Sequence, residues 1–453
     1  MEGINVIQQH VKAQELFFQV QSVYYHYLLK SLTEAEPVRR FDDKTPVRKI
    51  PTPFVWDTDD LLKMTEGKIS HILGDQFKAI DDYELRARLP LPPFLFVTRV
   101  THLDALKGEM KSPASLTFEY DIPKEGLFVH DDRLLEIAAA EASHAVILLL
   151  SYMGCDFWHK GDICFRVLAS TFTFSQEIPI PPGPGKTLEG IITIRTMARM
   201  GATRLVSYDY QCRIDGIDYL TCSAKGGFFS RRELDTMLLP KGAARGKDTI
   251  TCVSGVNQEK SVNQEKEEVI PFLSCKKQQF SQDDLTALCH GDFLACFNKD
   301  YVPESFFCFS PPSLLMIDRI DRIDREGGAF GLGEMRASYP IDPDHWVFQA
   351  HFKNDPVLPG TLMATGCYQL AAFYLLFLGW HKLRGNRYYS ILRGKTAKIK
   401  FLGQVRPARS QLTYEVQIKS ISRLRLECIA QARVFHEDNC VIEFQDFGVA
   451  FLG

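Results

Sequence analysis

An internal repeat constrains the fold of this chain more than any other sequence feature. The segment Asp59–Leu73 matches Asp283–Phe297 at one fixed offset, with an Asp-Asp-Leu triplet and a glycine in the same places. Further on, each half carries a long apolar segment that ends in glycine, Leu134–Gly154 in the first half and a segment ending at Gly379 in the second. Because repeated segments fold as copies of one unit, we expect two related halves.

Strand-like runs follow the apolar segment in both halves, and several alternate between apolar and polar residues, as half-buried antiparallel strands do. In the first half they are Phe165–Phe174, Leu188–Thr196, Thr203–Ile214 and Tyr219–Phe229; in the second they are Thr396–Phe401, Leu412–Ile421, Arg423–Phe435 and Val441–Phe451. Each half is therefore predicted to be an antiparallel sheet wrapped around one long helix, an α+β arrangement. Two such halves can pair edge to edge into one continuous sheet.

Composition along the chain sets the predicted boundaries. Residues 1–34 carry apolar positions at helical spacing and are predicted to form an amphipathic helix, and residues 35–57 form a proline-rich connector. The first half spans 58–238 and the second 271–453. Between them, residues 239–270 are rich in Gly, Lys and Ser and contain Val-Asn-Gln-Glu-Lys twice, which indicates a flexible linker.

The amino-acid composition is that of a globular protein, with 45% apolar residues, 24% charged residues and a net charge of −3. This balance does not favour nucleic acid or an anionic membrane as a partner. The twelve cysteines are dispersed and form no C-x-x-C pair. Thiols within apolar runs (Cys164, Cys222, Cys367 and Cys428) are predicted to be small buried hydrophobic residues in a reducing compartment. No signal peptide is visible, and Leu370–Trp380 is too short and interrupted to span a bilayer, so we predict a cytoplasmic protein without membrane insertion.

The second half contains the clearest candidate for chemistry. His351 stands in an aromatic run that begins at Trp346 and is predicted to be strand-like. The turn Asp355–Gly360 follows, and after it an apolar segment with helix-favouring composition. Backbone N–H groups at such a helix start face back toward the histidine loop. An imidazole opposite a positive helix end is suited to polarising a carbonyl group and moving a proton.

These residues resemble a known enzyme family, the hot-dog-fold 3-hydroxyacyl-ACP dehydratases, and within it the 3-hydroxydecanoyl-ACP dehydratase branch. The resemblance rests on His351-Phe352, on Asp355-Pro356-Val357-Leu358-Pro359-Gly360, on Cys367 to Leu370 and on Lys400 to Pro407. The tandem arrangement resembles the dehydratase regions of polyunsaturated fatty acid synthases. The similarity spans roughly residues 58 to 453 and is specific only in the second half. It implies a double hot-dog fold, with the two halves paired as a pseudo-dimer.

The resemblance also implies roles for individual residues. His351 takes the C2 proton of the substrate thioester, the N–H of Gly360 polarises the thioester carbonyl group, and the carbonyl group of Val357 orients the imidazole. The family's carboxylic acid belongs five residues after Gly360, where this chain has Thr365. A threonine hydroxyl group cannot donate a proton near neutral pH, so the second half cannot supply the acid.

The first half departs from the family in the opposite way. Its histidine position falls on Asp131, but its apolar helix carries Glu141, followed by alanine as the family's acid is. We therefore predict one catalytic site, made of His351 and Glu141 at the interface of the halves. The opposite interface would place Asp131 near Thr365 and be inactive. Glu136, one turn before Glu141, is the alternative acid.

The resemblance implies a hydro-lyase that converts (3R)-hydroxyacyl-ACP to trans-2-enoyl-ACP in fatty acid, polyunsaturated fatty acid or polyketide-type synthesis, without cofactor or metal. The substrate would be carried on the phosphopantetheine of an acyl carrier protein, and the other partners would be synthase modules, with a homodimer left open. An anionic carrier implies a basic rim. Its candidates are Arg393, Lys395, Lys398 and Lys400, although their alternation also fits a solvated strand face.

Other interpretations stay open from the sequence. The same residues could also isomerise trans-2 to cis-3 enoyl chains. A thioesterase shares the fold but lacks the Asp-Pro turn after the histidine. Thr365 keeps open a third class, a non-catalytic acyl-chain-binding scaffold. His130 and His144 are out of register with the family's histidine, and Cys289, His290 and Cys296 lack further ligands at zinc spacing, so none of them is assigned a role.

Overall fold

The computed structural model describes residues 55–158, 160–200, 203–236 and 269–452. The described residues all belong to one compact unit, which comprises residues 53–239 and 244–453. The predicted N-terminal helix, nearly all of the proline-rich connector and nearly all of the linker lie outside them.

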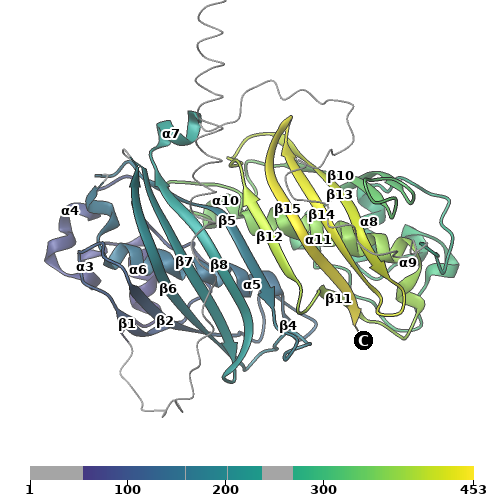
Figure 1. Ribbon diagram of the computed structural model, residues 1–453, viewed down its shortest axis with the longest axis horizontal. Coiled ribbons are helices and arrows are strands. Elements are labelled where there is room, and N and C mark those ends of the chain that lie inside the picture. The colour runs from purple at the N-terminus through teal and green to yellow at the C-terminus, as the bar shows by residue number, and fades with distance from the viewer. Residues whose placement is uncertain (1–54, 159, 201–202, 237–268, 453) are drawn as a thin grey trace, which may run out of the picture. The chain divides into compact units, whose positions relative to one another are not determined.

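One antiparallel sheet of 13 strands runs through this unit in the order β1-β2-β6-β7-β8-β5-β12-β15-β14-β13-β10-β9, with β11 also paired to β15 (Figure 1). The first-half strands are β1 (Arg99–Asp104), β2 (Ala114–Asp121), β5 (Cys164–Phe174), β6 (Thr187–Met200), β7 (Thr203–Ile214) and β8 (Ile217–Phe229). The second-half strands are β9 (Arg319–Asp324), β10 (Glu334–Ile341), β11 (Tyr388–Ile391), β12 (Thr396–Phe401), β13 (Ser410–Ser422), β14 (Glu427–His436) and β15 (Asn439–Leu452). A separate ribbon pairs β3 (Val129–His130) with β4 (Arg133–Leu134).

The two halves meet along the pair β5–β12, whose register runs from Thr173 opposite Thr396 to Ala169 opposite Lys400. The predicted edge-to-edge joining of two sheets is therefore confirmed. On β12, Ala397 is buried and Lys398 is exposed, so alternate side chains face the interior and solvent. At the far edges lie β1 and β9, which the repeat places in corresponding positions of the two halves.

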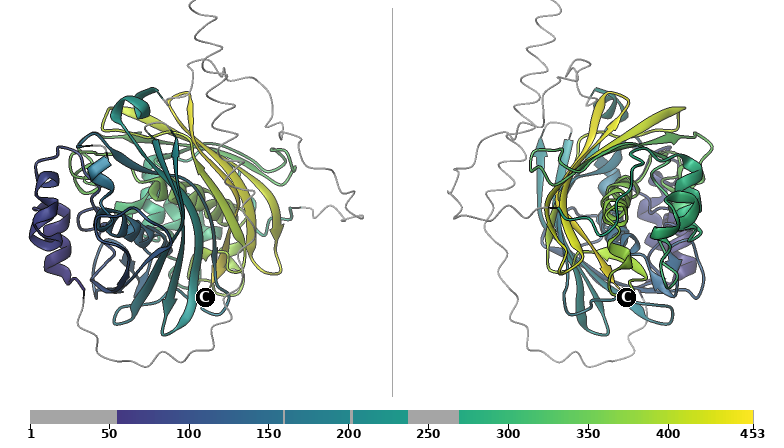
Figure 2. Two further views of the ribbon diagram at one scale, coloured as in Figure 1. Left: turned by 60° about the vertical axis from the view of Figure 1, so that its left-hand side comes forward. Right: turned by 90° about the vertical axis from the view of Figure 1, so that its right-hand side faces the viewer.

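A central helix lies on the inner face of each half. In the second half it is the continuous helix α11 (Gly360–Phe377), and Figure 2 shows the sheet curving around it. In the first half it is α5 (Glu136–Glu141), a 3-10 turn at Ala142–Ala145 and α6 (Val146–Tyr152). Helix α11 is apolar and long enough to cross a membrane, but 83% of it is buried inside the protein, as a core helix would be.

The remaining helices are short, and two of them begin the corresponding segments of the two halves. Helices α2 (Thr58–Glu66) and α8 (Gln282–Cys289) begin with the same capping box, in which a side chain and the backbone bond reciprocally across the first turn. The N-cap of α2 is Asp57, and that of α8 is Ser281. The others are α3 (Ser70–Leu73), α4 (Lys78–Asp81), α7 (Arg231–Thr236), α9 (Phe293–Cys296) and α10 (Val347–Ala350).

Two sequence-based expectations were wrong. The run from Trp346 to His351 is not a strand; it forms the short helix α10, in which the N–H of His351 donates to the carbonyl group of Val347 at 2.9 Å. Burial of Val347, Phe348 and Ala350 against the core outweighs their strand propensity. Strand β14 begins at Glu427 and not at Arg423, because residues 423–426 form a turn that ends with Leu426 at φ +55°.

The cysteines behave as predicted, with one exception. Cys164, Cys367 and Cys428 are buried and free, whereas Cys222 is half-buried. Burial raises the pKa of the Cys164 and Cys428 thiols to about 12. These side chains are therefore neutral, small hydrophobic groups.

Candidate active site

His351 follows α10 and is fixed by a reciprocal pair of hydrogen bonds with Val357. The ring Nδ1 lies 3.0 Å from the carbonyl oxygen of Val357, and the N–H of Val357 donates to the carbonyl group of His351 at 2.9 Å. Because a carbonyl oxygen can only accept, Nδ1 must carry the proton, and Nε2 presents its lone pair. This Nε2 is buried and has no hydrogen-bond partner among the described residues.

Gly360 is the first residue of α11 and lies just after the histidine loop. A side chain there would meet the ring of Phe401 on β12, since a Cβ atom would lie 2.2 Å from Cε1. Glycine is therefore required because the start of α11 closely approaches β12, the second-half strand at which the two sheets join. The first N–H groups of α11 have no carbonyl group within the helix to bond, so they form the positive end of its dipole.

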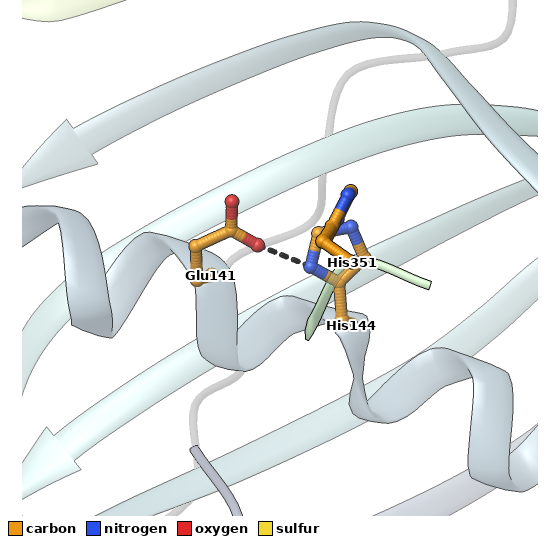
Figure 3. A group of neighbouring side chains, drawn as sticks. All are labelled: Glu141, His144 and His351. Atoms are coloured by element: carbon orange, nitrogen blue, oxygen red, sulfur yellow. Dashed lines mark ion pairs between the residues drawn. The ribbon is translucent and has the colours of Figure 1, made fainter. Parts of the chain in front are cut away.

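Glu141 is the last residue of α5 and is only 2% exposed. One carboxylate oxygen accepts a hydrogen bond from the hydroxyl group of Thr361, in the first turn of α11. The other oxygen pairs with Nδ1 of His144 (Figure 3). The functional atoms of Glu141, His144 and His351 lie within 4.8 Å of one another. The structure thus brings the predicted base and the predicted acid together from opposite halves.

His144 is the residue of this cluster that has no role in the sequence-based prediction. Its imidazole packs edge-on against that of His351, with ring centroids 5.5 Å apart. It lies three residues after Glu141, within the 3-10 turn, where residues i and i+3 are eclipsed. In the sequence, the i, i+3 spacing from Glu141 could have pointed to His144. The resemblance could not, because His144 is out of register with the family's histidine.

Burial and mutual charge set the protonation of the cluster. Burial lowers the pKa of His351 to about 4, against the opposing attraction of Glu141. Burial favours the neutral form of Glu141, but His144, together with His351 and Thr361, outweighs burial and lowers the pKa of the carboxyl group overall. Burial likewise disfavours charge on His144, yet Glu141 raises the pKa of that imidazole. His351 is therefore a free base at neutral pH, and the two opposite shifts within the Glu141–His144 pair favour a carboxylate beside a protonated imidazole.

The alternative acid, Glu136, is engaged elsewhere. Its carboxylate accepts hydrogen bonds from the Ser390 hydroxyl group, the N–H of Ile391 at 3.3 Å and the guanidinium group of Arg393 at 3.1 Å. Arg393 also lies over the ring of Phe174. Of the two glutamates, Glu141 is the one beside His351.

The second interface differs from the expectation. Thr365 donates to the carbonyl group of Thr361 at 3.0 Å, within its own helix, and lines the interior cavity. Asp131 was expected beside it, but its side chain is 51% exposed and pairs with Arg133 at 2.8 Å. The β3–β4 ribbon, which the sequence did not predict, turns Asp131 outward, with φ at +52°.

A cavity of about 240 Å³ joins these regions and is lined by both halves. It contains the cluster at His351 and extends to Glu136 and Thr365. Between them the lining is largely apolar and aromatic: Phe165, Phe172, Phe174, Phe309, Tyr389 and Phe401. Such a lining suits a hydrocarbon chain, with polar groups gathered at the cluster.

The residues predicted to form a basic rim differ in their surroundings in the structure. Arg393 is a buried partner of Glu136, with 10% of its side chain exposed, so it is not a surface residue. Lys398 is exposed on β12, and Lys400 pairs with Glu443 of the neighbouring strand at 3.3 Å. This alternation favours the solvated strand face over a rim.

Glu141, His144 and His351 are also the residues, among those described, that could hold a metal ion. Cys289, His290 and Cys296 do not form a comparable cluster: the imidazole of His290 is exposed and contacts the carbonyl group of Thr286 at 2.8 Å.

Comparisons with known proteins agree with this architecture. Residues 309–445 match the model of the FabA-like domain. Over 374 residues, 81% of its length, the chain is 30% identical to a polyunsaturated fatty acid synthase subunit of Thraustochytrium sp., and it spans 24% of that relative's length.

The matches to solved structures are far more distant in sequence. The 12:0-ACP thioesterase of Umbellularia californica is 9% identical with a TM-score of 0.34, and the match covers 75% of this chain and 96% of that one. The dehydratase heterocomplex ApeI:P of Xenorhabdus doucetiae is 12% identical with a TM-score of 0.27, covering 35% of this chain and 95% of that one. The structure itself has the predicted double hot-dog architecture, one continuous sheet with a central helix in each half. Its second half contains a match to the FabA-like domain, and most of the chain is similar to part of a polyunsaturated fatty acid synthase subunit.

Proposed function

We propose that the protein dehydrates (3R)-hydroxyacyl thioesters to trans-2-enoyl thioesters, as one catalytic region of a fatty acid, polyunsaturated fatty acid or polyketide-type synthase. One observation carries this proposal. A free imidazole nitrogen from one half, a carboxyl group from the other and a helix start converge at the end of an apolar cavity, with the imidazole and carboxyl atoms within 4.8 Å of each other. The FabA-like match over residues 309–445 supports the same reaction class.

The first step is removal of the C2 proton. Nε2 of His351 accepts this proton, and the Val357 carbonyl group keeps the ring in the tautomer that can do so. Negative charge then develops on the thioester oxygen, and the N–H of Gly360 at the start of α11 stabilises it. No cofactor is needed for this step.

The second step is loss of the C3 hydroxyl group. The C3–O bond breaks, the C2–C3 double bond forms, and the departing oxygen takes the proton held by the Glu141–His144 pair through the Glu141 carboxyl group. Water leaves, and the proton on His351 returns to the pair through solvent. The hydrogen bond from Thr361 holds Glu141 toward the cavity for this transfer.

The acyl chain would occupy the apolar cavity between the halves, while the thioester is delivered on the phosphopantetheine of an acyl carrier protein. That carrier and the other synthase modules are the proposed partners, in the cytoplasm. The relative from Thraustochytrium supports this context, since it is named as part of a synthase.

The direct test is product analysis with the full chain and a (3R)-3-hydroxyacyl thioester. Mass spectrometry should show the enoyl thioester, about 18 mass units lighter by loss of water. Release of the free acid would instead identify a thioesterase, and unchanged substrate would identify a scaffold. A cis-3 product alongside the trans-2 product would add isomerisation to the activity, because the same base and acid can move the double bond.

A further inference from the structure

The cluster at His351 has the chemical make-up of a transition-metal site. Two imidazoles and one carboxylate are a donor set that Zn²⁺ and related divalent ions bind in proteins. The candidate ligand atoms of Glu141, His144 and His351 lie within 4.8 Å of one another. Ligand atoms around one Zn²⁺ lie roughly 3.4 Å apart. A movement of about 1 Å by each side chain would therefore bring all three atoms to coordination distance of one ion.

The spacing of Glu141 and His144 supports a shared ligand role. They form a Glu-x-x-His sequence on one helical segment, and this i, i+3 spacing lets a carboxylate and an imidazole reach the same metal ion in helical metalloproteins. In the structure both side chains already point to the same place, because they pair with each other (Figure 3).

His351 has the surroundings typical of a metal-ligating histidine. Its Nδ1 donates to the carbonyl group of Val357 at 3.0 Å, which leaves the lone pair of Nε2 available to a metal ion. Ligating histidines commonly have such a carbonyl partner on the other nitrogen, since it fixes ring orientation and tautomer. The same Nε2 is buried, 4% of the residue being exposed, and lacks a partner among the described residues.

An ion could reach this place. All three residues line the cavity, so a fourth coordination position would face open space, where water or a substrate oxygen could bind. We propose that Glu141, His144 and His351 bind one divalent transition-metal ion, Zn²⁺ being the best match, and that this ion blocks dehydration. The blocking role rests on the proposed function, because the ion would occupy the lone pair of His351 and the carboxylate of Glu141.

Binding is tested first, without turnover. The full chain is treated with a chelator and titrated with Co²⁺, a spectroscopic substitute for Zn²⁺. One equivalent should bind and give visible bands of a nitrogen- and oxygen-ligated ion, without the near-ultraviolet band of a cobalt–thiolate bond. X-ray absorption of the Zn²⁺-loaded wild-type protein should show two imidazoles and no sulfur. Sulfur ligation in that spectrum would overturn the proposal.

Variants then locate the ion. Glu141→Gln, His144→Gln and His351→Gln should each weaken Co²⁺ binding by at least about 100-fold, as loss of a direct ligand exceeds the usual effect of its outer partners. His130→Gln is the matched control, since His130 lines the same cavity outside the cluster. Cys222→Ala and Cys308→Ala control for cavity thiols. Unchanged affinity in any of the three ligand variants, or a loss in a control, would contradict the assignment.

The blocking role is tested by turnover of a 3-hydroxyacyl thioester. Zn²⁺ should slow the metal-free wild-type protein in competition with substrate, and chelator should restore the rate. Full activity in the presence of one bound equivalent would disprove the blocking role and leave the metal site standing. Absence of turnover in the metal-free protein would contradict the proposed function, while the binding experiment would still decide the metal site.

Discussion

The two central helices occupy corresponding places in the two halves, but they carry opposite residues. Helix α11 begins with Gly360 and has Thr365 five residues later, whereas α5 begins with Glu136 and has Glu141 five residues later. At the first position only glycine fits against Phe401, while the glutamate of the other half is held by Arg393. The two halves thus contribute different residues to the proposed site, the glycine from one and the acid from the other.

The histidine loops differ in the same way. The loop before α11 bends inward, and two hydrogen bonds between His351 and Val357 close it. The loop before α5 forms the β3–β4 ribbon and leaves Asp131 exposed. The two interfaces therefore differ in geometry: one brings His351 and Glu141 together, while the other leaves Thr365 on the cavity wall and Asp131 exposed.

Removing the base should give the largest effect. His351→Ala should lower kcat/KM for a 3-hydroxyacyl thioester by about 10²–10⁴, the usual contribution of a general base. Steady-state rates of enoyl thioester formation measure this. A rate within about tenfold of wild type would exclude the base role.

The next prediction concerns the stability of the fold and the ion pair that anchors the histidine loop. Asp355 forms a bidentate pair with Arg166 of β5 at 2.6 and 2.7 Å, and both side chains are largely buried. Asp355→Ala leaves a buried cation without its partner, so the free energy of unfolding should fall by about 3–5 kcal/mol. Urea denaturation measures the loss.

A surface pair provides the control for that measurement. Glu443→Ala removes the exposed partner of Lys400 and should cost less than about 1 kcal/mol. Equal losses in the two variants would show that the loop anchor is no more than a surface contact.

A smaller effect is expected from the contact that joins the two helices at the site. Thr361→Val removes the hydrogen bond to Glu141 and keeps the side-chain shape. Hydrogen bonds to charged groups contribute about 1.5–3 kcal/mol, so kcat should fall by roughly 10- to 100-fold with KM little changed. A change confined to KM would indicate that Thr361 binds substrate and does not hold the acid.

Substitution at the first-half position that corresponds to His351 should have almost no effect on activity. Asp131 is exposed and pairs with its neighbour Arg133. Asp131→Asn should alter kcat/KM by less than about twofold, since surface pairs contribute little. A large loss of kcat/KM would indicate that the second interface is also catalytic, and the two halves would then not differ in the way described.

Much of the fold was predictable because it is local. Strands such as Thr203–Ile214 and Thr396–Phe401 alternate over most or all of their length, and the structure has the same bounds. The errors arose where tertiary packing decides: the aromatic run after Trp346 became a helix once its apolar side chains were buried together. The break of the first central helix at Ala142–Ala145 has no local signal such as Gly or Pro.

The site was predictable only in part. The resemblance pointed to His351, Gly360 and Val357, and the repeat pointed to Glu141 in the other half; the structure brings all four together, while their roles remain predictions. His144 was missed, because its importance comes from contacts with Glu141 and His351 that form only after folding.

We propose one site that uses a base from the second half and an acid from the first. The most direct test compares Glu141→Gln with Thr365→Val, the same helical position in the two halves. We expect Glu141→Gln to lower kcat by at least about 100-fold and Thr365→Val to stay within about twofold of wild type. Comparable rates for the two variants, or a larger loss in Thr365→Val, would contradict this proposal.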